Sequence, residues 1–128
     1  MFLWRIAAAA LAALLLGPAG AAHNEPISAG KLAARLDEGR TPVILDVRTE
    51  WEYRSGHVPG ALHIPHTELA ARLSDISADP GEEIVVYCEQ GPRAEQAEAI
   101  LEKAGFDGAR TLRGHMSQWR AGDYPVQR

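Results

Sequence analysis

The only cysteine of the chain, Cys88, lies where a sulfur nucleophile could be built. It follows an apolar run at residues 84–87 and precedes residues 94–101, whose pattern is typical of an amphipathic helix. The order of strand, tight loop and helix would place Cys88 at the end of a strand, with backbone N–H groups and a helix N-terminus just beyond it. Both features favour a thiolate over a thiol, so we expect a partly exposed Cys88 with a lowered pKa.

The loop after the cysteine has the composition of an anion-binding cup. Its six residues are Cys88, Glu89, Gln90, Gly91, Pro92 and Arg93. Gly91 permits a sharp turn that points N–H groups inward, and Arg93 adds a permanent cation where the helix begins. A cysteine without such a loop is more often a small buried hydrophobic residue, so the prediction of a nucleophile depends on the loop.

Strands and helices alternate along the rest of the chain. Strands are expected at residues 43–46, 61–64, 84–87 and 108–112, and helices at 28–39, 49–56, 67–73, 94–105 and 116–121. This order predicts a single α/β domain over residues 22–128, with a small central parallel sheet and helices on both faces. Ligands bind at the carboxyl ends of the strands in such sheets, which is where Asp46 and Cys88 fall.

Several motifs resemble those of the rhodanese-like (sulfurtransferase) family and occur in that family's order. The cysteine loop resembles the family's active-site loop, and Leu45-Asp46-Val47-Arg48 resembles its strand-end Asp-Val-Arg. Residues 53–64, which contain His57-Val58-Pro59-Gly60-Ala61, resemble its N-terminal signature, and residues 112–126 resemble its closing pattern. The resemblance covers residues 27–126 and is greatest to the periplasmic single-domain type.

This resemblance implies an exported thiosulfate sulfurtransferase. Sulfane sulfur would pass from a small anionic donor such as thiosulfate to cyanide or a thiol, through a persulfide on the catalytic Cys88. Backbone N–H groups of residues 89–93 would bind the substrate and hold the persulfide. Arg93 would either orient the oxyanion or face Asp46 or a helix glutamate. Phosphatases and arsenate reductases that resemble this fold have one more residue in the loop, so the short loop favours sulfur transfer.

Four supporting residues are also implied by the resemblance. Asp46 would lie beneath the loop and accept hydrogen bonds from it, Arg48 would pair with Glu52 near the surface, and His57 would fix the turn before Pro59. The fourth, His115, departs from the family, which usually has a second glycine after Gly114. Its ring could line the mouth of the site or cap the following helix, and we favour the cap because histidine tolerates unusual backbone angles.

A second function class stays open, namely a rhodanese-like module that displays a sulfur-carrying or inert loop to a partner protein. The net charge of −4 and the lack of a basic run give no sign of nucleic-acid binding. No metal site is expected, because His57, His63 and His66 do not fall on one face. We also expect no cofactor and a monomer.

The first 21 residues have the order of a secretory signal peptide. Arg5 precedes an apolar run at residues 6–16, Gly17-Pro18 interrupts any helix, and Ala19-Gly20-Ala21 offers small residues to a signal peptidase. The apolar run is shorter than the roughly 20 residues of a membrane-spanning helix. We therefore expect cleavage after Ala21, rather than retention as a membrane anchor, and a periplasmic or secreted mature protein.

Overall fold

The structure is a computed structural model that describes residues 24–128. The expected signal peptide at residues 1–21 lies outside the described residues. Within the described part of the chain, no helix is both long and apolar enough to cross a membrane.

Across residues 24–128, four short parallel strands form one sheet in the order β2-β1-β3-β4. The strands are β1 (Val43–Asp46), β2 (Leu62–His63), β3 (Ile84–Tyr87) and β4 (Ala109–Thr111). The two central strands pair along their whole length, and Asp46 is in register with Tyr87. The carboxyl ends of β1 and β3 therefore lie side by side, and Cys88 begins its loop beside the end of β1.

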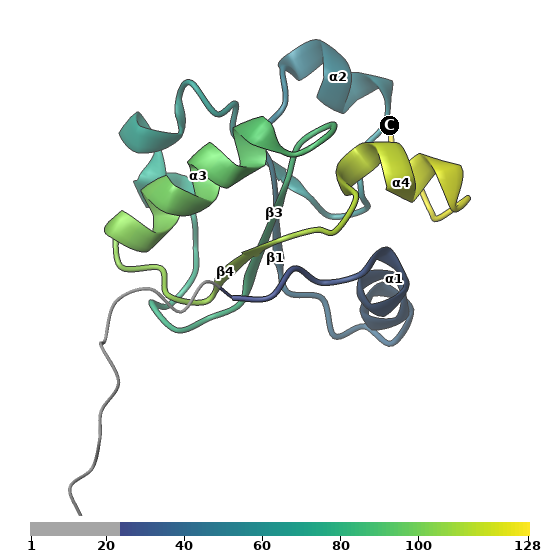
Figure 1. The fold of residues 1–128 in the computed structure, drawn as a ribbon, viewed down its shortest axis with the longest axis horizontal. Helices are drawn as coiled ribbons and strands as arrows, with labels where there is room; N and C mark the ends of the chain where they lie inside the picture. Colours follow the sequence, from purple (N-terminus) through teal and green to yellow (C-terminus); the bar gives the residue numbers. More distant parts are fainter. Residues whose placement is uncertain (1–23) are drawn as a thin grey trace, which may run out of the picture.

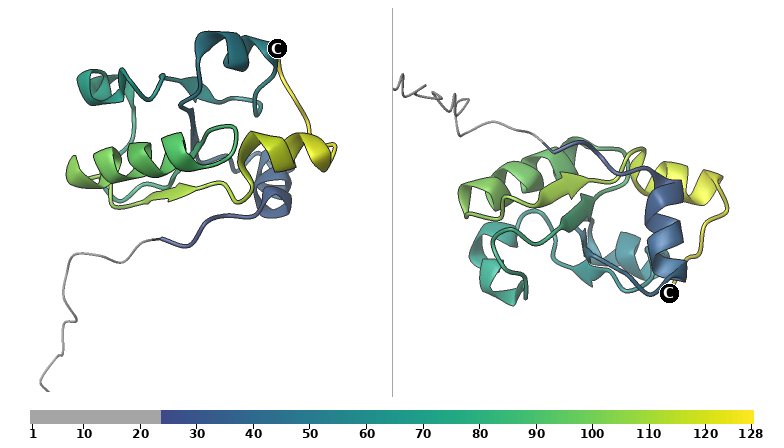
Figure 2. Two further views of the ribbon diagram at one scale, coloured as in Figure 1. Left: turned by 45° about the horizontal axis from the view of Figure 1, so that its top comes forward. Right: turned by 90° about the horizontal axis from the view of Figure 1, so that it is seen from below.

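Helices cover both faces of the sheet, which confirms the expected α/β architecture (Figures 1 and 2). The helices are α1 (Ala29–Asp37), α2 (Glu50–Ser55), α3 (Pro92–Lys103) and α4 (His115–Ala121). One core contains residues of α1 and α4, and the other contains residues of α3. The short helix α2 lies beyond the carboxyl ends of β1 and β3, close to the cysteine loop (Figure 1).

Residues of β3 alternate between the two cores. Ile84 and Val86 belong to the core on the α3 side, whereas Val85 and Tyr87 belong to the core on the α4 side. All four side chains are buried, as is typical of a central parallel strand. Because the alternation continues past the end of the strand, Cys88 belongs to the α3 side.

Local sequence signals define several helix ends. Ser28 caps α1 by accepting a hydrogen bond from the Lys31 N–H, and Thr49 and Glu52 form the expected capping box of α2.

The prediction of an α-helix at residues 67–73 is wrong. That segment forms two 3₁₀ turns, η1 (Leu69–Ala71) and η2 (Leu73–Asp75). Such a short segment, with Leu69 as its one buried side chain, has too little apolar surface to support a regular α-helix.

The C-terminal segment returns to α2. His57 and Gln127 form an antiparallel bridge with two backbone hydrogen bonds of 2.9 Å. Trp119 of α4 donates from Nε1 to the Pro125 carbonyl at 2.7 Å. The chain end therefore ties α4 to the segment that follows α2, as the position of the C-terminus in Figure 2 shows.

Candidate active site

Cys88 is the first residue after β3, and it is only 1% exposed. The Gly91 N–H donates to its Sγ at 3.0 Å. Gly91 has a φ of 141°, a conformation that side chains disfavour, and this turn directs the N–H back toward the sulfur. The expectation of a partly exposed Cys88 is wrong, because the sulfur side of the residue packs into the α3 core and His115 contacts its backbone.

The pKa of the Cys88 thiol is lowered from 9.0 to about 7. Burial is the largest influence and raises the pKa, but hydrogen bonds from the His115 side chain and from the N–H groups of Ala94 and Gly91 together outweigh it. About half of the thiol would therefore be ionised at neutral pH. The direction agrees with the sequence-based expectation, although the leading stabilising contact comes from His115 rather than from Arg93.

The cysteine loop is also joined to α4 through backbone hydrogen bonds. Met116 N–H donates to the Cys88 carbonyl at 3.0 Å, and Ser117 N–H donates to the Glu89 carbonyl at 3.1 Å. These N–H groups belong to the first turn of α4, whose N-cap residue Gly114 has no side chain to satisfy them. The loop carbonyls thus take the place of a helix cap, and two hydrogen bonds join the loop to α4.

His115 contacts the loop with its ring and does not cap α4. Its side chain is 8% exposed, and Nδ1 accepts a hydrogen bond from the Cys88 N–H at 3.3 Å. A Cβ atom at Gly91 would lie 3.3 Å from Nε2, so the ring also lies against the turn of the loop. The capping role favoured from the sequence is wrong, because left-handed backbone at Gly114 and His115 directs the ring toward the end of β3.

Arg93 lies in the first turn of α3, and its guanidinium pairs with Glu52 of α2. Nη1 donates to Oε1 at 2.7 Å and Nη2 to Oε2 at 2.9 Å, a two-pronged ion pair. The hydrogen bond from Arg93 is the main reason that the pKa of Glu52 falls to about 2. Of the alternatives left open for Arg93, the structure shows the one in which it faces a helix glutamate.

Asp46 and Arg48 form a buried ion pair at the end of β1. Arg48 Nη2 donates to Asp46 Oδ2 at 2.8 Å, and its backbone N–H donates to Oδ1 at 2.9 Å. Tyr87 completes the set with an O–H···Oδ2 hydrogen bond of 2.7 Å. The expectation that Asp46 accepts hydrogen bonds from the cysteine loop is wrong, because Arg48 and Tyr87 are its hydrogen-bonding partners.

Arg48 connects this buried pair to the loop. Its Nη1 donates to Glu89 Oε2 at 3.3 Å, and Glu89 also pairs with Arg120 of α4. The expected surface pair of Arg48 with Glu52 is therefore wrong, since Arg48 turns inward and Glu52 pairs with Arg93. No sequence signal marked Arg120 for this contact, and Tyr87 was simply one residue of an apolar run.

The remaining residues expected at the site lie as follows. Gln90 and Pro92 are exposed on the loop, and Pro92 is the first residue of α3. His57 is buried against α2, where Nδ1 lies 2.9 Å from the Tyr53 carbonyl oxygen and the ring stacks on Tyr53. Within residues 24–128, no group of three His, Cys, Asp or Glu side chains could hold a metal ion.

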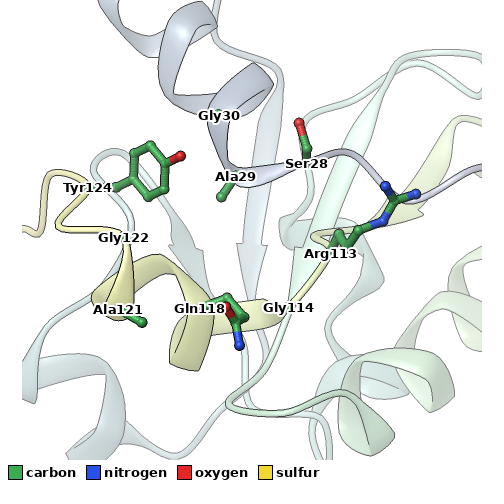
Figure 3. Close-up of a pocket in the computed structure, with 9 residues that line it drawn as sticks. All are labelled: Ser28, Ala29, Gly30, Arg113, Gly114, Gln118, Ala121, Gly122 and Tyr124. Atoms are coloured by element: carbon green, nitrogen blue, oxygen red, sulfur yellow. The ribbon is translucent and has the colours of Figure 1, made fainter.

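A groove of about 490 Å³ lies between α1 and α4 (Figure 3). Its lining residues are Ser28, Ala29, Gly30, Arg113, Gly114, Gln118, Ala121, Gly122 and Tyr124. None of them belongs to the cysteine loop. This groove is thus lined by other residues than the side chains that contact Cys88.

The fold and the site together define a parallel α/β protein with an activated cysteine at the carboxyl edge of its sheet. The rhodanese-like domain family matches residues 28–122. The chain therefore belongs to the rhodanese-like domain family, as the sequence motifs indicated.

The chain is similar to individual proteins of more than one kind. A sulfurtransferase of Allochromatium vinosum is 32% identical over 100 residues, which are 78% of this chain and 92% of that protein. The HTH-type transcriptional regulator Rv0324 of Mycobacterium tuberculosis is 36% identical over 105 residues, and the match spans 45% of its length.

Solved structures show the same fold. The Alr3790 protein from Anabaena sp. matches with a TM-score of 0.72 and 33% identity, covering 79% of this chain and 90% of that one. The human single-domain sulfurtransferase TSTD1 matches with a TM-score of 0.66 and 30% identity, covering 75% and 95% of the two chains.

Proposed function

We propose that this protein is a thiosulfate sulfurtransferase that carries sulfane sulfur on Cys88. The observation that supports this proposal most directly is the state of the thiol. Cys88 Sγ accepts the Gly91 N–H at 3.0 Å, and its pKa lies near 7 although the residue is buried. A thiolate that is populated at neutral pH and held by backbone N–H groups is suited to nucleophilic attack on sulfur.

The reaction would take place in two displacements. The Cys88 thiolate attacks the outer sulfur of thiosulfate, a new S–S bond forms, and the S–S bond of thiosulfate breaks so that sulfite leaves with the electron pair. In the second displacement, cyanide or a thiolate attacks the terminal sulfur of the persulfide. The Cys88 thiolate then leaves, so the protein returns to its first state without a net change in oxidation state.

The surroundings of Cys88 support a small donor whose sulfane sulfur is terminal. The residue is 1% exposed, so a bulky disulfide or polysulfide would have poor access to its sulfur. Glu89 is paired with Arg48 and Arg120, and its charge is therefore compensated as an anion approaches. The N–H groups that lower the pKa of the thiol would also hold the negative charge of the persulfide.

Export of the protein is the second part of the proposal. It is supported by the order of charge, apolar run and small-residue cleavage site in residues 1–21. Sulfur transfer would then take place in the periplasm or outside the cell, and the acceptor would be a nucleophile available there.

Intact mass after incubation with thiosulfate tests the proposed chemistry. The protein should gain one sulfur atom, lose it on addition of cyanide, and release thiocyanate in steady state. Cys88→Ser should show none of these effects while it melts as the unaltered protein does. A protein that gains no sulfur and forms no thiocyanate would contradict the proposal and favour the alternative, a rhodanese-like module that binds a partner protein.

A further inference from the structure

We propose that His115 positions the Cys88 thiolate for sulfur transfer, through a neutral ring that accepts from the loop backbone with one nitrogen and donates toward the sulfur with the other. This inference rests on the proposed function. It assigns His115 to the reaction itself, rather than to the shape of the adjoining helix.

The protonation of the ring follows from its contact with the loop. Nδ1 accepts from the Cys88 N–H at 3.3 Å, so in the neutral ring the proton lies on Nε2. Nε2 lies beside Gly91, the residue whose own N–H donates to Sγ at 3.0 Å. Nε2–H therefore faces the turn whose N–H group binds the sulfur, and hydrogen bonding from the His115 side chain is one of the influences that favour the thiolate of Cys88.

The backbone of this region is arranged to hold the ring there. His115 has a φ of 53°, a conformation uncommon for residues other than glycine, and it persists although the side chain is buried. Gly91 provides the complementary space, because a side chain at that position would lie within tight contact of the ring. The ring of His115 therefore lies against the backbone of Gly91, where a side chain at residue 91 would crowd it.

Three other charged side chains of the loop and its surroundings are held in ion pairs. Arg93 is bound by Glu52, and Glu89 lies between Arg48 and Arg120. The negative charge of Asp46 is compensated by its buried ion pair with Arg48. Arg93 also interacts electrostatically with Cys88. Its guanidinium group, however, is bound to Glu52 of α2 by two hydrogen bonds. The imidazole is therefore a side chain that contacts Cys88 without an ion pair of its own to hold it elsewhere.

Three substitutions separate the two hydrogen bonds of the ring. His115→Asn retains an acceptor near the place of Nδ1 and tolerates left-handed backbone, but it has no group at Nε2. His115→Gln places an N–H donor near Nε2 and loses the acceptor. His115→Gly removes both, and its backbone is relaxed at a φ of 53°. His66→Asn is the control, because it removes an imidazole from outside the loop.

The first measurement is the rate of alkylation of Cys88 against pH. The inflection should lie near 7 in the unaltered protein and in His66→Asn, and rise toward about 8.5 in His115→Asn and His115→Gly. Alkylation at pH 7 should then fall about 15-fold, since the ionised fraction drops from about half to about 3%, while the rate at high pH stays the same. His115→Gln should keep an inflection nearer to 7.

The second measurement is hydrogen exchange of the Cys88 N–H, which should remain protected in His115→Asn and exchange faster in His115→Gly. An inflection near 7 in either His115→Asn or His115→Gly would overturn the proposal, whatever His115→Gln does. Neither measurement requires sulfur transfer. If the expected shifts occur but thiosulfate leaves no sulfur on the unaltered protein, the proposed function fails, and what stands is that His115 holds Cys88 as a thiolate.

Discussion

Arg93 and Glu52 join the helix that follows the cysteine loop to the short helix that lies over the carboxyl ends of the strands. The two hydrogen bonds, of 2.7 and 2.9 Å, occupy both arms of the guanidinium fork. Arg93 thus holds the start of α3 against α2, so an anion bound by the loop would depend mainly on backbone N–H groups. The contact persists only while the Glu52 carboxylate is ionised.

Glu52→Gln should lower the free energy of unfolding at neutral pH by about 2 kcal/mol. This is less than the full shift in the pKa of Glu52 implies, because the Glu52–Arg93 ion pair is partly exposed to solvent. The pKa of Glu52 is lowered from 4.5 to about 2, so its contribution is complete above pH 4.5 and is lost as the pH falls toward 2. Chemical denaturation across this pH range measures the effect.

Glu50→Gln is the matched control for that experiment, because Glu50 lies on the same helix and pairs with Arg54 while both side chains are largely exposed. Its loss should cost less than about 0.5 kcal/mol. Equal effects of the two substitutions would show that the Arg93 contact contributes nothing beyond surface charge.

Asp46→Ala should be among the most destabilising substitutions in the described domain, at about 3–5 kcal/mol, because it leaves the Arg48 guanidinium buried without its partner. Tyr87→Phe removes one donor to Asp46 and the acceptor of the Val58 N–H, and should cost about 1–3 kcal/mol. Urea denaturation of both variants gives the comparison. Melting and sulfur transfer that remain unchanged in Asp46→Ala would exclude Asp46 from the support of the loop.

Gly91→Ala should disturb the loop in two ways. The φ of 141° disfavours any side chain, and the new Cβ would lie 3.3 Å from His115 Nε2. We expect a loss of about 1–3 kcal/mol in stability and a higher alkylation pKa for Cys88, since the Gly91 N–H would be displaced from Sγ. Gly81→Ala, at a position with no atom within 4 Å of the new Cβ, should change neither quantity. Normal alkylation of Gly91→Ala would refute this account of the loop.

The protein should have no significant aryl-phosphatase activity, although it has a cysteine loop followed by an arginine. Four residues separate Cys88 from Arg93, Pro92 supplies no N–H, and the Arg93 fork is already bound by Glu52. A phosphoryl group with three equatorial oxygens would find too few donors. Steady-state assays with an aryl phosphate and with thiosulfate plus cyanide decide the matter. Phosphatase turnover that depends on Cys88, without thiocyanate formation, would reverse the assignment.

The mature protein should begin at or near Ala22. The small residues Ala19, Gly20 and Ala21 follow an apolar run too short to span a membrane. N-terminal sequencing of protein recovered from an exporting host measures this directly. Recovery of the chain in the membrane fraction with Met1 retained would indicate an anchor instead.

The sequence by itself determined the α/β order, the family and the place of Cys88 before a helix. These features depend on local patterns, such as the apolar run at β3 and the capping box at Thr49. The residues that form each pattern are close together in the sequence, so no contact with a distant residue has to be known. The cysteine loop was recognisable for the same reason, because Cys88 and Gly91 lie within one turn.

Only the tertiary structure decided which charges meet. Glu52 and Arg93 are 41 residues apart in the chain, as are Arg48 and Glu89. A long flexible side chain at the carboxyl edge of the sheet can reach several partners, and local sequence carries no information on which one packing brings within hydrogen-bonding distance. The direction of the His115 ring was equally hidden, because it depends on left-handed backbone at Gly114 and His115 and on the space that Gly91 leaves across the loop.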